Sequence, residues 1–351
     1  MTAFFEKDNF SISGPNFSKK NLLNDTNLKW VVKAFIENYG DKFGKLKSIQ
    51  QINTLNINSK NYLCKTNSNN LVIKIISNKD ESYFNRIDYI SKSFKNKKSS
   101  SPKILFNNNS QSFTKIGNKA IQISEYINGR YFSGGQEDIK KAASAIYNFH
   151  KNSKTLSFSN LSNLPLFPEN GLEILDTIIK DLNKYKESLG IENSNLIYEN
   201  KKFLICNIKN FLKGNNLTHK AYPLHVDLHP HNVLITNDEG FVVDLDSVHL
   251  INPLTAIGFC FFKLIRQDIA NKSYSKKSRE IFIEIINNSD SDMFFDPKEA
   301  SFFIKKEVAR RLLFILEENI SNGFSKWNSV LKTQICGLHE VDIICKNEIF
   351  N

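Results

Sequence analysis

The stretch from His225 to Asp246 reads HVDLHPHNVLITNDEGFVVDLD and carries the strongest structural signal in the chain. Two alternating apolar runs within it, Val233–Thr236 and Phe241–Asp246, predict a pair of short strands. The tetrapeptide between them, Asn-Asp-Glu-Gly, is typical of a hairpin turn. We therefore predict a β-hairpin with polar side chains at both of its ends, namely Asp227, Asn232 and Asp244.

The polar residues of this hairpin are suited to phosphoryl transfer. Asn232, at the mouth of one strand, and Asp244, at the end of its partner, are expected to project side by side. Their hard oxygen atoms suit Mg²⁺, which takes few protein ligands and leaves positions open for phosphates. Asp227 precedes Asn232 in a loop, where it could accept the proton of an attacking hydroxyl. Phosphoryl transfer needs such a base, metal ligands and a cation on the phosphates.

A candidate for that cation lies in an apolar strand. Lys74 is flanked by isoleucines in the run Leu71–Ile76. A lysine is out of place there unless one face of the strand meets a polar ligand. We therefore expect Lys74 to face a bound anion.

The chain is rich in predicted strands before Gly129 and mostly helical after it. Strands are predicted at 46–57, 61–66, 71–76, 112–116 and 119–127, and helices at 27–39, 80–96, 136–152, 172–189, 195–213, 254–270, 275–288, 297–320 and 324–348. The predicted fold is α+β, with two lobes. Residues 1–128 form a sheet-rich N-terminal lobe, and residues 129–351 form a helical C-terminal lobe that contains the hairpin 225–246.

Length and composition restrict the class of protein. The chain has 351 residues, of which 40% are hydrophobic and 24% charged. These values exclude a disordered tail, a collagen-like polymer and a small disulfide scaffold. The net charge of +11 could indicate nucleic acid, but the Lys and Arg residues are scattered. We expect neither nucleic acid nor a membrane as a partner.

Cysteine usage and the N-terminus bear on the compartment. The five cysteines are far apart and form no CxxC pair, which favours reduced thiols over disulfides or a zinc site. The N-terminal residues MTAFFEKDNF lack the pattern of a signal peptide. We expect a soluble, cytoplasmic protein, and the sequence does not determine its oligomeric state.

The pattern His-x-Asp-x-x-x-x-Asn, followed by Asp-x-Asp, resembles the aminoglycoside phosphotransferase/choline kinase superfamily. The resemblance covers residues 45–270 and is strongest at 224–248. It implies a protein-kinase-like fold and an ATP- and Mg²⁺-dependent kinase that phosphorylates a hydroxyl group of a small molecule. The ending Asp-Leu-Asp-Ser-Val also resembles the sugar kinases of this group, including the N-acetylhexosamine kinases.

The resemblance implies a role for each residue of the hairpin region. Asp227 would be the catalytic base, and His225 would support the catalytic loop. Asn232 and Asp244 would bind Mg²⁺, and Asp246 would be an auxiliary metal ligand.

The resemblance also implies a nucleotide site in the N-terminal lobe. Lys74 would contact the α- and β-phosphates of ATP and pair with an acid on the following helix. Backbone groups near Glu125 and Ile127, in the hinge 123–129, would bind adenine. The best-placed acid is Glu81, with Asp80 and Asp88 as alternatives.

Two departures from the family pattern affect expected activity. No glycine occurs between Gly44 and Gly117, so the phosphate loop must use Ser and Asn side chains, with Ser59 as the candidate. Ala256 replaces the Asp that usually steadies the catalytic loop. His150 is expected to be a packed residue near a helix end rather than a catalyst.

Three other interpretations stay open on the sequence. A zinc hydrolase could use His225, Asp227, His229 and His231, because neutral His and carboxylate groups suit Zn²⁺. A non-catalytic nucleotide- or ligand-binding protein could be built on a kinase scaffold. The hairpin could also be a surface feature without chemical meaning. A sugar-like acceptor is favoured for a kinase, with an amino alcohol or a hydroxy amino acid next, because the chain is basic and most aminoglycosides are cations.

Overall fold

The computed structural model describes residues 15–53, 60–95, 97, 100–214, 220–288 and 294–348. These residues divide into two compact units. The sheet unit contains 15–162 and 223–249, and the helical unit contains 163–222 and 250–348. This division differs from the predicted lobes, because residues 129–162 and the hairpin belong to the sheet unit.

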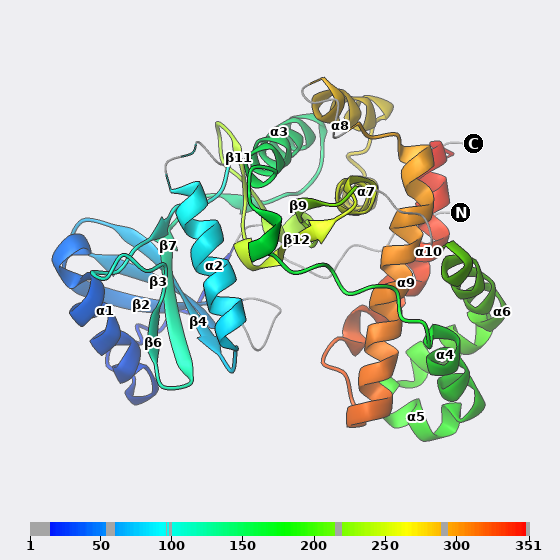
Figure 1. The fold of residues 1–351 in the computed structure, drawn as a ribbon, viewed down its shortest axis with the longest axis horizontal. Helices are drawn as coiled ribbons and strands as arrows, with labels where there is room; N and C mark the ends of the chain where they lie inside the picture. The colour runs from blue at the N-terminus through cyan, green and yellow to red at the C-terminus, as the bar shows by residue number, and fades with distance from the viewer. Residues whose placement is uncertain are drawn as a thin grey trace. The chain divides into compact units, whose positions relative to one another are not determined.

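The sheet unit is built on a seven-stranded antiparallel sheet (Figure 1). Its strand order is β1-β2-β3-β4-β7-β5, and β6 also pairs with β7. The strands are β1 Asn16–Phe17, β2 Leu46–Asn53, β3 Lys60–Thr66, β4 Asn70–Ser77, β5 Ile104–Leu105, β6 Thr114–Ile116 and β7 Lys119–Glu125.

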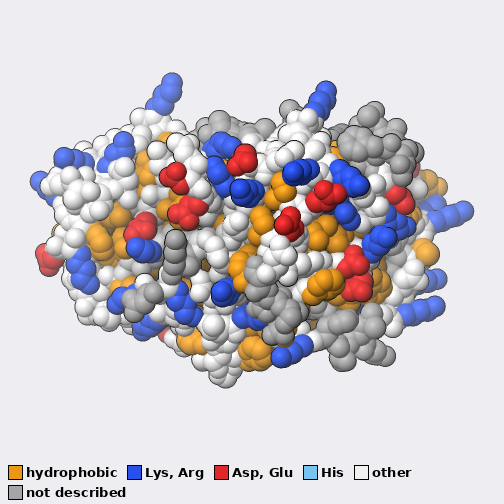
Figure 2. Space-filling model, turned by 90° about the horizontal axis from the view of Figure 1, so that it is seen from above, with side chains coloured by type: hydrophobic (Ala, Val, Ile, Leu, Met, Phe, Trp, Pro, Cys, Tyr) orange, Lys and Arg blue, Asp and Glu red, His pale blue; other side chains and the backbone are white. Residues whose placement is uncertain are grey.

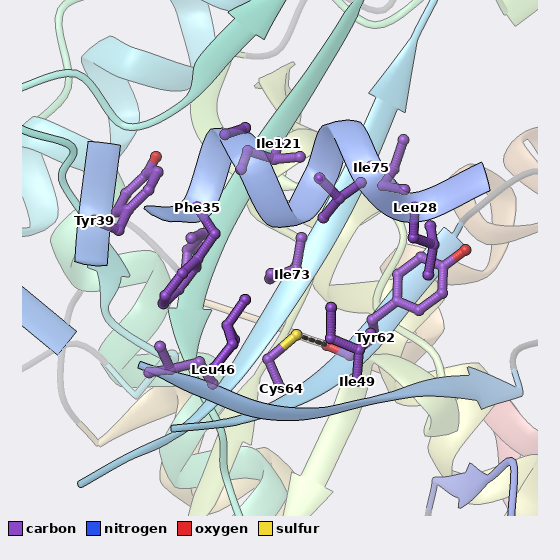
Figure 3. Close-up of a cluster of buried hydrophobic side chains, with 14 residues drawn as sticks. Leu28, Phe35, Tyr39, Leu46, Ile49, Tyr62, Cys64, Ile73, Ile75 and Ile121 are labelled. Carbon is purple, nitrogen blue, oxygen red and sulfur yellow. Dashed lines mark hydrogen bonds between the residues drawn. The ribbon is translucent and has the colours of Figure 1, made fainter. Parts of the chain in front are cut away.

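One face of this sheet packs against α1, Lys29–Phe43, as Figure 3 shows. Phe35 and Tyr39 of α1 are fully buried against alternate strand residues, including Ile73 and Ile121. Side chains alternate between the faces of a strand, so every second residue of β4 lies on this side. The alternation accounts for the buried isoleucines on either side of Lys74.

The other face of the sheet packs against α2, Glu81–Phe94. Ile76 and Ala120 meet Tyr83, Phe84 and Ile87 there. Lys74 has the same parity along β4 as Ile76, so its side chain belongs to the α2 side. The sheet therefore separates an apolar core under α1 from a partly polar region under α2.

The hairpin joins a second, smaller sheet in the same unit. Its order is β11-β10-β8, with β8 Arg130–Tyr131, β10 Val233–Ile235 and β11 Gly240–Val242. The helix α3, Gln136–Ser153, packs on it, and a Cβ atom at Gly240 would lie 2.6 Å from the Lys141 carbonyl oxygen. Only glycine permits this close approach. The remaining strands, β9 Tyr222–His225 and β12 Val248–Ile251, pair with each other.

The helical unit contains seven described α-helices. Gly258 of α7 and Gly171 of α4 allow close packing on α9, since a Cβ at either would lie 2.8 Å from an α9 side chain. The longest helix, α9, packs against α7, α10 and α4. The bounds are α4 Gly171–Lys180, α5 Leu182–Leu189, α6 Ile191–Lys213, α7 Pro253–Ala270, α8 Lys276–Asn287, α9 Pro297–Asn322 and α10 Leu331–Lys346.

The α+β fold class is confirmed, and several predicted boundaries are wrong. The predicted helix 172–189 is broken at Asp181, whose φ of −125° and ψ of 45° are not helical. The predicted helix 324–348 begins only at Leu331, after a 3₁₀ turn at Asn328–Val330. The short strands β1, β5, β8, β9 and β12 were not predicted, because segments of two to four residues carry too little periodicity.

A buried ion cluster stabilises α9. Both carboxylate oxygens of Glu307, whose side chain is 3% exposed, bind arginines one turn further along the helix. Arg310 binds at 2.7 and 2.8 Å and Arg311 at 2.7 Å. Burial opposes ionisation of Glu307, but the two guanidinium groups outweigh it and lower the pKa of its carboxyl.

Glu307→Gln should destabilise the helical unit by about 3 kcal/mol, because it leaves two largely buried guanidinium groups without their anion. Glu317→Gln, an exposed position on the same helix, is the matched control. Since the folded pKa is depressed, the contribution of Glu307 is present above the unfolded-state pKa and is lost as the pH falls through the folded value. Thermal unfolding of both variants at neutral and acid pH measures the effect. Equal stability of the two variants would contradict it.

None of the described helices is both long enough and apolar enough to cross a membrane. On the face drawn in Figure 2, Lys and Arg side chains are interspersed with Asp and Glu side chains.

Candidate active site

The central feature of the sheet unit is an ion cluster between β4 and the segment after β11. The ammonium nitrogen of Lys74 lies 2.7 Å from Asp244 Oδ1 and 2.6 Å from Asp246 Oδ2. Lys74 is 170 and 172 residues away from these acids in the sequence. The fold therefore unites the predicted phosphate-binding lysine with two of the predicted metal ligands.

A left-handed residue brings both acids to the same point. Asp244 has φ 73° and ψ 64°, a conformation that Asp tolerates better than most residues. The chain then enters a short 3₁₀ turn, Leu245–Ser247. The prediction of a strand continuing to Asp246 is wrong for this reason, because the extended backbone ends at Val242. In a continuous strand, Asp244 and Asp246 would also have shared one face, but the chain would not have turned after Asp244.

Electrostatics keep the cluster charged. Burial would lower the pKa of Lys74, but the carboxylates of Asp244 and Asp246 outweigh burial and hold the pKa well above its ordinary value. Burial likewise opposes ionisation of Asp246, and the ammonium of Lys74 lowers the pKa of that carboxyl. One cation thus sits between two carboxylates.

Tyr83 of α2 is a member of the cluster that the sequence analysis missed. Its hydroxyl donates a hydrogen bond to Asp246 Oδ2, the oxygen that also accepts from Lys74. Burial first, and then the charge of Asp246, raise the pKa of Tyr83 far above its ordinary value, so the hydroxyl keeps its proton. A tyrosine beside an apolar phenylalanine reads as core in sequence, and no motif distinguishes it.

The predicted pair of Lys74 with Glu81 does not form. Glu81 lies in the first turn of α2 with its side chain 69% exposed and binds Lys115 instead. Its neighbour Asp80 caps the helix by accepting from the Tyr83 N–H at 2.9 Å. Tyr83 lies with Phe84 and Ile87 on the buried face of α2, so Tyr83, not Glu81, faces the cluster. The alternative acid Asp88 accepts from the Ser112 N–H and pairs with Lys92.

Hydrogen bonds among its own residues fix the conformation of the predicted catalytic loop. The Asn232 amide nitrogen donates to the Asp227 carbonyl at 2.7 Å, and the Asp227 N–H donates to His225 Nδ1 at 3.2 Å. On the other side of its ring, His225 Nε2 lies 3.0 Å from the Asp244 carbonyl oxygen. A ring that accepts at Nδ1 and donates at Nε2 is neutral, and burial lowers the pKa of His225 accordingly.

The side chain of His225 is fully buried, and its ring is enclosed by hydrogen bonds to backbone groups. It links the backbone of Asp227 to that of Asp244. His150 supports it from α3, since its Nε2 accepts from the His225 N–H at 3.3 Å. Burial lowers the pKa of His150 to about 3, and the residue is packed near the helix end as expected.

The side chain of Asp227 is one-third exposed, and its Oδ2 lies 3.7 Å from His229 Nε2. It is thus a carboxylate with access to solvent on a loop fixed from both sides, which suits a base. The alternating histidines do not form a zinc site in the described residues, where no three His, Cys, Asp or Glu side chains converge on one point.

The chemistry of the donor set fits Mg²⁺. Asp244 and Asp246 converge on a single positive charge, now that of Lys74. Asn232 lies beside them in the hairpin, because its carbonyl accepts from the Val243 N–H at 3.0 Å. The amide nitrogen of Asn232 is bound to Asp227, which leaves the amide oxygen as its ligand atom.

The other predicted nucleotide-binding groups are placed less directly. Ser59 lies outside the described residues. The Glu125 N–H donates to the Lys103 carbonyl at 3.0 Å, and the Ile127 carbonyl accepts from Gly129. Gln122, which opposes Lys74 in the sheet, is buried, and its Nε2 atom has no hydrogen-bond partner among the described residues. Because buried donors normally have a hydrogen-bond partner, we expect a ligand on the Lys74 side of the sheet to accept from Gln122 Nε2.

Comparison with protein-family models and with curated proteins gives no significant match. Solved structures do match. A spectinomycin phosphotransferase in complex with ADP and spectinomycin aligns with a TM-score of 0.66 at 15% identity, over 91% of this chain and 98% of that one. The chain has the fold of these small-molecule phosphotransferases.

Two further structures with other acceptors share this fold. An amicoumacin kinase in complex with AMP-PNP and Ca²⁺ gives a TM-score of 0.58 at 11% identity, covering 84% of this chain and 87% of that one. An ethanolamine kinase from Plasmodium vivax gives a TM-score of 0.55 at 16% identity, covering 93% of this chain and 91% of that one. The protein-kinase-like fold expected from the sequence is therefore confirmed.

Proposed function

We propose that the chain is an ATP- and Mg²⁺-dependent phosphotransferase that phosphorylates a hydroxyl group of a small molecule. The observation that carries the proposal is the convergence of Lys74, Asp244 and Asp246 in the sheet unit. Lys74 is 170 and 172 residues away from the two acids, so their contact depends on the fold of the whole unit. The fold agrees, because the similar structures include kinases of spectinomycin, amicoumacin and ethanolamine.

Each residue has a definite task in this proposal. Lys74 leaves the two carboxylates and binds the α- and β-phosphates, and Asp244, Asp246 and Asn232 hold the metal. When bound, Mg²⁺ neutralises charge on the phosphates. Asp227 orients the acceptor hydroxyl and takes its proton, while His225 keeps the loop in place. Catalysis then rests mostly on positioning and charge neutralisation.

The acceptor is proposed to be neutral or anionic and sugar-like, with an amino alcohol or a hydroxy amino acid next. The net charge of +11 supports this order, since most aminoglycosides are cations that acidic pockets attract. In the helical unit, where the acceptor site is expected, Lys305 of α9 is paired with Asp342, so this order rests on the net charge of the chain.

An acceptor screen tests the proposal. Purified protein with ATP and Mg²⁺ is assayed for ADP formation over sugars, amino alcohols, hydroxy amino acids and aminoglycosides. We expect one class to raise the rate at least tenfold above the acceptor-free rate, and we expect sugars to be that class. Stimulation by aminoglycosides alone would contradict the acceptor class and leave the phosphotransferase intact.

Two other functions have distinct outcomes in the same experiment. A non-catalytic binding protein is favoured by Ala256, which is buried near the start of α7 and has no carboxylate to offer the catalytic loop. It would bind ATP, yet its turnover would equal that of Asp227→Asn with every acceptor. A zinc hydrolase would contain stoichiometric Zn²⁺ and bind no nucleotide.

A further inference from the structure

Asp246 is held by two donors of different chemistry. Its Oδ2 atom accepts from the Lys74 ammonium of β4 and from the Tyr83 hydroxyl of α2. The lysine is charged and flexible, whereas the tyrosine is neutral and fixed. We therefore expect the two donors to differ in whether they stay on Asp246 when phosphates and a metal ion bind.

The fixed position of Tyr83 follows from its packing. The ring is 9% exposed and belongs to the apolar cluster under α2. Its edge meets Phe84, with ring centroids 5.4 Å apart and planes at 88°. Lys79 and Arg86 lie 5.2 and 5.7 Å from the ring centroid. A tyrosine packed this closely has little freedom to withdraw its hydroxyl from Asp246.

The proposed function requires Lys74 to change its partner, whereas Tyr83 can keep its hydrogen bond to Asp246. Lys74 has to leave Asp246 when it binds phosphates, and an ammonium beside the carboxylate would also repel a metal ion. The neutral hydroxyl of Tyr83 can stay, because a carboxylate has several acceptor positions. Asp246 then has one donor to fix its orientation toward the metal.

We propose that Tyr83 is a positioning residue that holds Asp246 for the metal ion and so links α2 to the metal-binding segment. This inference rests on the proposed function. A second connection runs parallel to it, since Arg86 of α2 donates to the Val248 carbonyl at 3.2 Å, two residues beyond Asp246.

Tyr83→Phe tests the inference, because it removes the hydroxyl and keeps the packing of the ring. The matched control is Tyr89→Phe on the same helix, whose hydroxyl accepts from the Ser157 N–H at 2.6 Å and does not contact the cluster. Mn²⁺ binding in the presence of ADP is measured by electron paramagnetic resonance, and turnover is measured as a function of Mg²⁺. Circular dichroism verifies that both variants are folded.

We expect Tyr83→Phe to weaken Mn²⁺ binding about tenfold, the effect of one hydrogen bond to a charged group. The Mg²⁺ concentration at half-maximal rate should rise by a similar factor, while kcat at saturating Mg²⁺ changes less than about threefold. Tyr89→Phe should match the wild type. Unchanged Mn²⁺ affinity in Tyr83→Phe, or equal weakening in both variants, would overturn the inference.

A double-mutant cycle asks whether Tyr83 acts through Asp246. In the Asp246→Ala background, which offers no side-chain acceptor, Tyr83→Phe should have almost no further effect on Mn²⁺ affinity. A full tenfold effect in that background would contradict the proposed route. Failure of the proposed function is distinguishable, because the wild type itself would then show no Mn²⁺ binding that depends on ADP.

Discussion

Replacement of Asp244 by alanine is expected to lower ATP turnover by about a thousandfold or more. Loss of a metal ligand removes several kcal/mol of charge stabilisation from the transferring phosphoryl group, and about 4 kcal/mol corresponds to that factor. The side chain of Asp244 is one-third exposed, so its loss leaves no cavity in the core. Steady-state kinetics and Mg²⁺-dependent nucleotide binding measure the effect.

The backbone of Asp244 requires a second variant. Alanine in the left-handed conformation costs about 1 kcal/mol or more, so Asp244→Ala could disturb the turn as well as the metal site. Asn tolerates this conformation, and Asp244→Asn removes only the charge. Asp238→Asn, in the exposed hairpin turn, is the control for charge alone. Turnover by Asp244→Asn at the rate of Asp238→Asn would show that the metal site is misassigned.

Replacement of Asp227 by asparagine should lower kcat by about 10² to 10⁴, the usual contribution of a general base. Nucleotide affinity should stay within about twofold of the wild type, because Asp227→Asn keeps the backbone N–H and carbonyl hydrogen bonds that Asp227 makes in the loop. Turnover and binding of a non-hydrolysable ATP analogue are measured on the same preparation. Parallel loss of both would instead place Asp227 in the nucleotide site.

The two substitutions give different signatures. Asp244→Asn should lose metal-dependent nucleotide binding together with turnover, and Asp227→Asn should lose turnover alone. This contrast separates a metal ligand from a base even when both variants are inactive. An identical profile for the two would contradict the division of roles.

The sequence predicts best where the signal is local. The hairpin follows from alternation around Asn-Asp-Glu-Gly, and the unusual setting of Lys74 follows from its apolar neighbours in β4. Lys74 and Asp244 are 170 positions apart, and no local pattern in the sequence indicates their contact; the family resemblance implied instead that Lys74 pairs with an acid on the following helix. The structure places the two groups within 2.7 Å.

The sequence analysis misassigned the partner of Lys74 and the end of the second hairpin strand, because no local motif marks either feature. Tyr83 lies on the buried face of α2, whereas Glu81 is exposed and pairs with Lys115. The alternating pattern predicts a strand that continues to Asp246, but the strand ends at Val242 and Asp244 adopts a left-handed conformation. No local pattern marks the contact of Tyr83 with Asp246 or the left-handed conformation of Asp244.

Transfer of the phosphoryl group to an acceptor tests the central claim most directly. Wild type and Asp227→Asn are incubated with ATP, Mg²⁺ and the best acceptor of the screen, and the products are followed by ³¹P nuclear magnetic resonance. We predict a phosphomonoester of the acceptor, formed together with ADP by the wild type and at least about a hundredfold more slowly by the variant. Formation of inorganic phosphate alone, or of the same products at the same rate by both proteins, would contradict the account.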